Sequence, residues 1–568
     1  MEDDSDTLLT KLGTGKWTII YCLVLSIWFF ILPMHTMAGA FMAPFVEHTC
    51  RQPPDAYMAT TTTYTLDSNY TTNSNGSLPL PNFDASCNYL VEESDGRLVE
   101  EPCTDWDFDN STFTSTVTSE FQLVCGRKYL RATYQSMYMI GMLVGAGSTA
   151  FFADRFGRWL MIAISTVIYT VIAFVTAWLP NFPSILAARF LLGTMHPASL
   201  MAGFILVLEV TEMKMRSLTG LMLFTSWGIG TIMFSGMAYL VRAWRWLQLV
   251  ASLPGLLFIF LLCILGESPR WLAVVGQHQR ALKEYKRAAA WNKVTLPPDH
   301  EILEIMLRVQ QQAVSTRKPY SSNKSLKSIV RNILHDFTVL IRTSKVRLVT
   351  LVMCVDYLVG AMLFFGLTLG ASALGVDPFL YMAISGIMEL PSTTILIPIT
   401  NYFGRKKVLF INYGISAVVL LTQPFISNDL KWLSVTLVMI GKFASANAFN
   451  LVFLYSLELF PTEIRSQGMN VAMAASRVGG IIAPYLINAV DSTYPWISSV
   501  LFGAGAAVAG LALLPLWETI NTRLPDTVAD LEGFTDPLQS PAVEEEEKLQ
   551  ASSGEDPENK KSNLPTPC

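Results

Sequence analysis

Ala153-Asp154-Arg155-Phe156-Gly157-Arg158 is a short charged stretch between two long apolar runs, and its pattern occurs twice in the chain. About 250 residues later, Thr400-Asn401-Tyr402-Phe403-Gly404-Arg405-Lys406 repeats the Gly-Arg turn between two further apolar runs. Asn401 stands in the second copy where Asp154 stands in the first. A motif that recurs at a fixed distance indicates an internal duplication.

Other landmarks recur at the same distance. Glu209 and Arg216 match Glu458 and Arg465, and Glu267 matches Glu518. The register therefore holds from the turns to the end of each half, so the chain is interpreted as two homologous halves.

The composition indicates that lipid surrounds much of the chain. Of its 568 residues, 51% are hydrophobic and only 15% are charged. Twelve apolar runs are each long enough to cross a bilayer as a helix, and six fall in each half. They lie at 17–43, 131–153, 159–179, 183–208, 218–240, 247–266, 348–370, 379–400, 408–425, 432–453, 466–488 and 494–516.

This pattern predicts an all-α membrane protein of twelve transmembrane helices in two six-helix bundles. The bundles are expected at 17–266, with a large loop at 44–130, and at 348–517. A tail at 1–16, a linker at 267–347 with helix-like stretches near 278–290 and 300–314, and a largely disordered tail at 518–568 complete the predicted organisation.

Charge distribution predicts how the chain is oriented. The 44–130 loop is acidic, whereas the 267–345 segment and both Gly-Arg turns are rich in Arg and Lys. Basic segments favour the cytoplasmic side. We therefore expect the loop outside, both termini in the cytoplasm, and contact with membrane lipid along the helices.

The predicted outer loop carries signs of secretory-pathway chemistry. Three glycosylation sequons begin at Asn69, Asn75 and Asn110. Four of the eight cysteines also lie in the loop, which predicts two disulfides with three possible connectivities: Cys50, Cys87, Cys103 and Cys125. No metal site is expected.

The duplicated turns can act as conformational latches. Arginines at a turn can reach carboxylates at other helix ends of the same half, and breaking such a cluster biases one conformational state against another. The simpler alternative is that these charges only set topology. The candidate latch residues are Asp154, Arg155, Arg158, Glu209, Arg216, Arg405, Glu458 and Arg465. For Arg189, snorkelling to the interface and a functional role are both open.

The combined pattern resembles the solute carrier 22 family of organic cation, organic anion and carnitine transporters, within the major facilitator superfamily. The resemblance covers nearly the whole chain. It rests on the cysteine-bearing loop, the 153–158 turn, Trp244-Arg-Trp-Leu-Gln248, Gly266-Glu-Ser-Pro-Arg-Trp-Leu272, Glu458-Leu-Phe-Pro-Thr-Glu-Ile-Arg465 and Leu524-Pro-Asp-Thr-Val528. Ala150, where the superfamily turn usually has Gly, and Asn401 depart from it.

Ionisable residues inside membrane helices are candidates for substrate contact. Glu389, Lys442 and Arg477 stand in the middle of runs of the second half, and Asp356 is a fourth candidate. The resemblance implies that Glu389 matches an acid of cation carriers and that Arg477 matches an Arg of anion and carnitine carriers. Thr393 stands where some anion carriers have Lys. Alternatively, Glu389 and Arg477 neutralise each other.

Aromatic residues are expected to complete the site by cation–π and stacking contacts. Tyr357 and Phe364 are seven residues apart, which puts them on one helical face, and Phe365 follows directly. The remaining aromatic candidates are Trp227, Tyr138, Tyr134 and Phe224.

These features predict transport of small organic ions by alternating access, with organic cations or carnitine-like zwitterions as the favoured substrates. An organic anion transporter is the alternative within the same class, and a non-transporting receptor is the alternative of another class. An enzyme is not expected, no cofactor or nucleic-acid partner is predicted, and Na⁺ or a counter-transported ion is a candidate partner. The chain contains no P-loop for ATP-driven transport.

Overall fold

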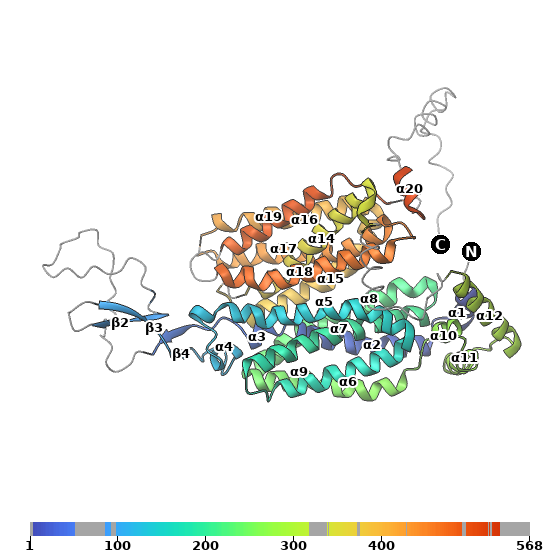
Figure 1. Ribbon diagram of the computed structural model, residues 1–568, viewed down its shortest axis with the longest axis horizontal. Helices are drawn as coiled ribbons and strands as arrows, with labels where there is room; N and C mark the ends of the chain where they lie inside the picture. Colours follow the sequence, from blue (N-terminus) through green and yellow to red (C-terminus); the bar gives the residue numbers. More distant parts are fainter. Residues whose placement is uncertain are drawn as a thin grey trace, which may run out of the picture.

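The computed structural model describes residues 4–51, 84, 86–92, 98–316, 338, 340–371, 375–427, 429–490, 496–520, 522 and 525–533. Within these ranges the side chains of some residues, Asp154 and Thr393 among them, are not described. Figure 1 shows two bundles of long helices side by side, one built from the first half of the chain and the other from the second half.

Six long helices form each bundle. In the first half they are α2 (Lys16–Thr36), α5 (Tyr129–Phe156), α6 (Arg158–Thr176), α7 (Phe182–Val210), α8 (Arg216–Leu240) and α9 (Trp244–Leu261). In the second half they are α14 (Ser344–Leu369), α15 (Pro378–Phe403), α16 (Arg405–Leu421), α17 (Lys431–Leu459), α18 (Arg465–Val490) and α19 (Trp496–Ala512).

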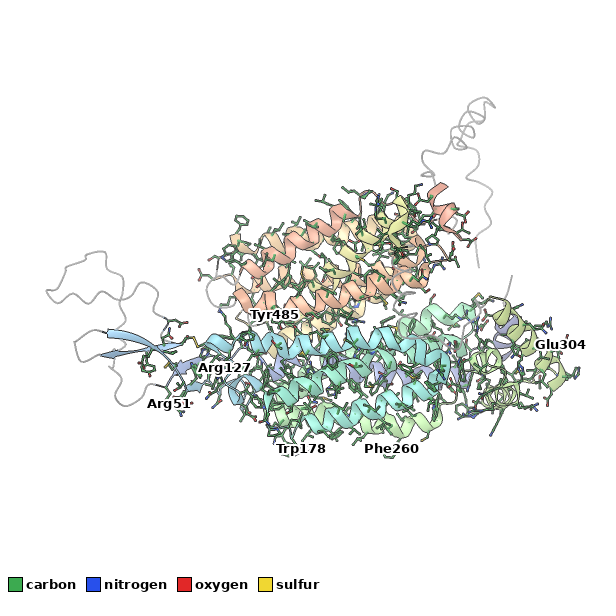
Figure 2. The ribbon with its side chains drawn as sticks, in the orientation of Figure 1. Arg51, Arg127, Trp178, Phe260, Glu304 and Tyr485 are labelled. Carbon is green, nitrogen blue, oxygen red and sulfur yellow. A yellow bond between two sulfur atoms is a disulfide. The ribbon has the colours of Figure 1, made fainter. Side chains whose placement is uncertain are left out.

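Ten of the described helices are long and apolar enough to cross a membrane. The 28-residue α5 and the apolar, 17-residue α19 complete the set of six in each half. Large apolar side chains cover the outside of the bundles, and Figure 2 shows Trp178 and Phe260 pointing away from the first one. They are 66% and 74% exposed, as expected for side chains that face lipid.

Shorter elements gather at the two ends of the bundles. One end, here called the turn end, carries Gly157 and Gly404 together with α1 (Asp4–Leu12), α10 (Pro269–Val274), α11 (His278–Asn292), α12 (Asp299–Thr316) and α20 (Val528–Gly533). The opposite end, the loop end, carries α3 (Gly39–Met42), α4 (Val117–Glu120), β1 (His48–Cys50), β2 (Asn88–Glu92), β3 (Leu98–Pro102) and β4 (Trp106–Phe108). Four 3-10 turns are η1 (Cys125–Arg127), η2 (Met213–Met215), η3 (Leu262–Ile264) and η5 (Gln423–Phe425).

The loop is held together by two antiparallel strand pairs and two disulfides. β1 pairs with β4 and β2 pairs with β3. Cys50 is bonded to Cys103 and Cys87 to Cys125, so the two expected disulfides are present and one of the three connectivities is selected. A hydrogen bond from Arg51 lowers the pKa of Asp107 across the first strand pair. Asn110 is exposed, whereas Asn69 and Asn75 lie outside the described residues.

Both Gly-Arg turns have the same local structure. Gly157 and Gly404 adopt φ of +99° and +92°, a backbone region that is nearly reserved for glycine. Glu267 accepts hydrogen bonds from the N–H groups of Arg158 and Trp159 at the start of α6. Glu518 does the same for Arg405 at the start of α16. A carboxylate thus neutralises the positive end of each helix dipole.

The two bundles meet along α5 with α18 and along α8 with α15. Gly228 and Gly386 let α8 and α15 approach closely, since a Cβ on either would lie 3.1–3.3 Å from the carbonyl oxygen of the other. Nearer the loop end, Ser136 donates a hydrogen bond to the carbonyl of Ile481 at 2.8 Å. Thr133 contacts the hydroxyl of Tyr485 at 3.0 Å, and Figure 2 places Tyr485 at the junction of the bundles.

The duplicated glycines generate a stability prediction. A Cβ at Gly157 would lie 2.2 Å from Glu267 Oε2, and one at Gly404 would lie 2.4 Å from Glu518 Oε2. Gly157→Ala and Gly404→Ala should each lower the free energy of unfolding by about 1–3 kcal/mol, because the backbone must leave its φ and the carboxylate must move.

Thermal melting of the detergent-solubilised protein measures this effect. Gly147→Ala is the matched control, because Gly147 lies in α5 with no atom within 4 Å of its added Cβ. If all three variants melted together, the proposed need for glycine at the turns would be wrong.

Candidate functional site

A buried ion pair lies between α15 and α17 in the second half. Lys442 Nζ lies 3.2 Å from Glu389 Oε1, and the two side chains are 0% and 9% exposed. The ammonium also donates to the carbonyl of Phe364 at 3.1 Å and to the hydroxyl of Thr368. It lies 3.5 Å from the centroid of the Phe364 ring.

These contacts satisfy the buried charge of Lys442. The ammonium donates two hydrogen bonds, to Phe364 and Thr368, and its counter-charge is Glu389. A charge out of water is tolerated only when it is paired and hydrogen-bonded. Lys442 therefore balances Glu389 in this conformation.

Arg477 is placed differently. It lies near the middle of α18 and is half-buried. Its Nη1 atom lies 4.0 Å from the sulfur of Met142 on α5, in the opposite bundle. Within the described residues no carboxylate lies in ion-pair range of Arg477. The expected alternative, a Glu389–Arg477 pair, is therefore replaced by a Glu389–Lys442 pair.

Asp356 is not part of this arrangement. It is fully buried in α14, and among the described residues neither of its carboxyl oxygens has a hydrogen-bond partner. Of Thr393, only the backbone position on α15 is described.

Three aromatic candidates of α14 all face into the second bundle. The rings of Phe364 and Phe365 meet edge to face at 5.3 Å, and Phe364 stacks on Phe449 of α17 at 5.6 Å. Tyr357 bonds to Ser456 of α17 at 3.0 Å. Tyr357 and Phe364 thus share the α17-facing side of α14, but only Phe364 contacts Lys442.

A second polar cluster is buried in the first bundle. The hydroxyl of Tyr138 lies 2.8 Å from His196 Nδ1 and 2.9 Å from the hydroxyl of Tyr169. The ring of Trp227 lies 6.2 Å from that of His196. Tyr138 and Trp227 therefore belong to one network, whereas Phe224 is 47% exposed and lies outside it.

Arg189 is the cation of this cluster. Its guanidinium lies 4.6 Å from the ring centroids of both Tyr134 and Tyr138, and it donates to the carbonyl of His35 at 2.7 Å. The side chain is 0% exposed. Snorkelling of Arg189 to the interface is therefore wrong, because two aromatic faces and a backbone carbonyl hold the charge inside the bundle.

The two clusters approach each other across the interface of the bundles. Gly228 follows Trp227 on α8, and a Cβ added to it would lie 3.5 Å from Cβ of Glu389. Met142, on the same helix as Tyr138, contacts Arg477. The site is therefore a central region formed by α5 and α8 of one half and by α14, α15, α17 and α18 of the other.

The candidate latch residues form two matching ion pairs at the turn end. Arg158 lies 3.2 Å from Glu209, and Arg405 lies 3.1 Å from Glu458. Arg155 is exposed, with its guanidinium 5.7 Å from the ring of Phe156. The side chain of Asp154 lies outside the described part of the chain.

The other two arginines do not match each other. Arg216 pairs with Asp6 of α1, whereas Arg465 donates to the carbonyl of Phe460 and to Thr462. Thr368, Met142 and Asp6 were not predicted as members of these sites. Thr368 follows Phe364 by four residues, so helical periodicity places both on one face of the helix. This spacing is the sequence signal that could have found Thr368.

Comparison with known proteins identifies the class of molecule. The sequence profile described as "Sugar (and other) transporter" matches residues 69–525. "Solute carrier family 22 member 6-A" of Xenopus laevis is 31% identical over 77% of this chain and 76% of its own. The chain belongs to the solute carrier 22 family.

Some relatives are named as organic cation transporters and others as organic anion transporters. "Organic cation transporter protein" of Drosophila melanogaster is 28% identical and covers 94% of each chain. "Organic anion transporter 3" of Oryctolagus cuniculus is 28% identical and covers 96% of each chain. The xylose transporter XylE of E. coli, in a partially occluded inward-open conformation, shares the fold with a TM-score of 0.60 at 15% identity, over 90% of this chain and all of its own.

Membership of the solute carrier 22 family makes this protein a membrane transporter of the major facilitator type and not an enzyme. The family expectation and the twelve-helix prediction are thus confirmed. The names of the relatives leave the charge of the substrate open.

Substitutions of Glu389 and Lys442 distinguish the effect of their charge pairing from that of side-chain packing. Glu389→Gln should lower the free energy of unfolding by about 3–5 kcal/mol, because it leaves the Lys442 ammonium buried without a counter-charge. Adding Lys442→Met to Glu389→Gln should recover most of the loss.

Thermal melting of the single and double variants checks this prediction. Ile387→Ala is the control on the same helix, because Ile387 is 48% exposed. Purely additive losses in the double variant would contradict a direct pairing.

Proposed function

We propose that this protein carries small organic anions, above all carboxylates, across the plasma membrane by alternating access of its two bundles. The observation that carries the proposal is the half-buried guanidinium of Arg477, which pairs with no described carboxylate while Lys442 satisfies Glu389. Arg477 is therefore a cation of the central region without a described counter-charge, and a carboxylate on the substrate would balance it.

Arginine suits this role better than lysine would. Its planar guanidinium presents two parallel donors to one carboxylate, which fixes orientation as well as charge. The rings of Phe364 and Phe365 are buried on the neighbouring α14 and would supply apolar contacts to the rest of a small organic molecule during the cycle. The relatives named organic anion transporters support this assignment.

Carnitine-like zwitterions, which the sequence favoured, are the second candidate. Their carboxylate would use Arg477 in the same way, while their ammonium would require Glu389 to leave Lys442 during the cycle. The fly relative named as an organic cation transporter supports this alternative. A non-transporting receptor is less consistent with two matching sets of charges at the turn end, because a receptor does not need to alternate.

In the proposed cycle, two ion pairs act as conformational latches. Arg158–Glu209 and Arg405–Glu458 occupy equivalent positions in the two bundles. Breaking such pairs when the bundles rock would bias the two access states. We infer that the loop end faces the outside, because it carries the disulfides and an exposed sequon at Asn110, and that both termini lie in the cytoplasm.

Coupling to Na⁺ or to a counter-transported ion is best tested by uptake. Labelled aromatic carboxylate, carnitine and a quaternary ammonium, each offered with and without Na⁺, separate the substrate classes and the coupling ion in one panel. Binding of all three without uptake would favour the receptor.

Arg477→Ala gives the sharpest substrate prediction. Uptake of an aromatic carboxylate should fall by about 10- to 100-fold, because a charge-assisted hydrogen-bonded pair is lost. Arg477→Lys should recover only part of it, since the ammonium cannot form the bidentate contact.

Any uptake of a quaternary ammonium should stay unchanged in the same cells. The control is Val478→Ala, which alters the next, 38% exposed residue of α18. Equal loss of both substrates in Arg477→Ala would assign the residue a structural role instead.

A further inference from the structure

At the loop end, an aromatic ring of the second bundle is enclosed by rings of the first. Phe379 lies in the first turn of α15 and is 5% exposed. Phe41 of α3 stacks on it at 5.5 Å with an interplanar angle of 12°. Phe113 of the disulfide-bonded loop lies 5.3 Å away and Tyr239 of α8 lies 5.7 Å away. These four residues are called the aromatic clasp.

Polar contacts from the first bundle hold the same residue. Ser235 of α8 donates a hydrogen bond to the carbonyl of Phe379. The guanidinium of Arg242 lies 6.0 Å from the centroid of the Phe379 ring and donates to the carbonyl of Ser111 in the loop. On its own side, Asp377 caps the start of α15 by accepting from the N–H of Phe379 at 2.8 Å.

Hydrogen bonds and an ion pair attach the loop segment around Phe113 to the first bundle. Thr114 N–H donates to the carbonyl of Arg242, and Trp244 N–H donates to the carbonyl of Ser115. Glu120 pairs with Arg245 and accepts from the indole of Trp244. Phe113 therefore moves with α8 and α9 as part of the first bundle.

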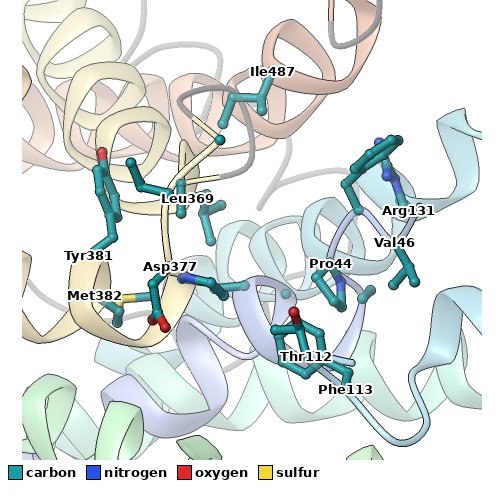
Figure 3. A pocket seen from close by; sticks show the side chains of 18 of the residues that line it. Pro44, Val46, Thr112, Phe113, Arg131, Leu369, Asp377, Tyr381, Met382 and Ile487 are labelled. Carbon is teal, nitrogen blue, oxygen red and sulfur yellow. The ribbon is translucent and has the colours of Figure 1, made fainter. Parts of the chain in front are cut away.

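A cavity of about 540 Å³ opens beside the clasp. Figure 3 shows that both bundles contribute to its lining, with Pro44, Phe113 and Arg131 on one side and Tyr381, Met382 and Ile487 on the other. Ser136 and Ile481 are bonded across the bundles at the same end. The loop side of the transport pathway is thus bounded by contacts that join the two halves.

We propose that Phe379, enclosed by Phe41, Tyr239 and the loop residue Phe113, is the gate that keeps the loop side of the pathway closed. This inference rests on the proposed alternating access. When the bundles rock to expose Arg477 toward the loop end, the ring of Phe379 must separate from the rings of Phe41, Phe113 and Tyr239. The disulfide-bonded loop is then a working part of the gate as well as an outer cover.

The ring contacts stabilise only the closed arrangement, so removing them shifts the population toward the loop-side-open state. A labelled cysteine away from the clasp distinguishes this population shift from a local cavity left by the removed ring. Ser136 serves this purpose, because it is buried and sits at the α5–α18 contact. Ser136→Cys is made in full-length protein whose Cys22, Cys263, Cys354 and Cys568 are changed to alanine.

The experiment measures the rate at which a membrane-impermeant maleimide labels this cysteine on intact cells. Phe379→Ala should speed labelling by about tenfold, and Phe113→Ala by several-fold, because each removes ring–ring contacts from the closed state. Phe379→Tyr, which keeps the ring, should label as slowly as the parent. Leu380→Ala is the matched control, because Leu380 is the next residue on α15 and is 50% exposed.

Two further measurements distinguish failure of the proposed gate from failure of the proposed orientation or of transport. Asp429→Cys, at an exposed position of the loop end, should label fully in every background, and its failure to label would overturn the proposed orientation. Uptake of the aromatic carboxylate in the same cells tests transport itself. Slow labelling of Ser136→Cys in Phe379→Ala would overturn the gate, and slow labelling in Phe113→Ala alone would remove the loop from it.

Discussion

A charge inside a membrane protein needs an opposite charge, water or a ligand, and this constraint organises the centre of the molecule. Lys442 meets it with Glu389 and two further acceptors. Arg189 meets it with two aromatic faces and a carbonyl. Among the described residues, Arg477 has neither a paired carboxylate nor enclosing aromatic faces. It lies where the two bundles face each other. The proposed substrate preference follows from this difference between three buried or half-buried cations.

The ends of the bundles show how duplication serves a moving structure. In each half a glycine with positive φ starts a helix, a carboxylate caps that helix, and an arginine of the turn pairs with a second carboxylate. Each set joins elements of its own half only, so these contacts do not oppose a movement of one bundle against the other. The loop end differs, because there the aromatic clasp joins one half to the other.

Sequence reasoning reached the fold because its signals are long and repeated. Twelve apolar runs and two copies of the Gly-Arg turn predicted the helices and their grouping, since membrane helices bond their own backbones and need no distant partner. The same reasoning left open whether Glu389 pairs with Arg477 and whether Arg189 reaches the interface. Both questions concern which side chain faces which, and that depends on helix rotation and packing. Phe379 carried no sequence signal, because an aromatic residue near a helix start is common and its three partners come from distant segments.

The central claim is that a substrate carboxylate supplies the missing partner of Arg477. The most direct measurement is an experimental structure of the full-length protein with a bound aromatic carboxylate. The account predicts that both carboxylate oxygens lie within hydrogen-bond distance of the Arg477 guanidinium while Lys442 stays with Glu389. A carboxylate bound to Lys442 in place of Glu389, or held away from Arg477 altogether, would contradict it.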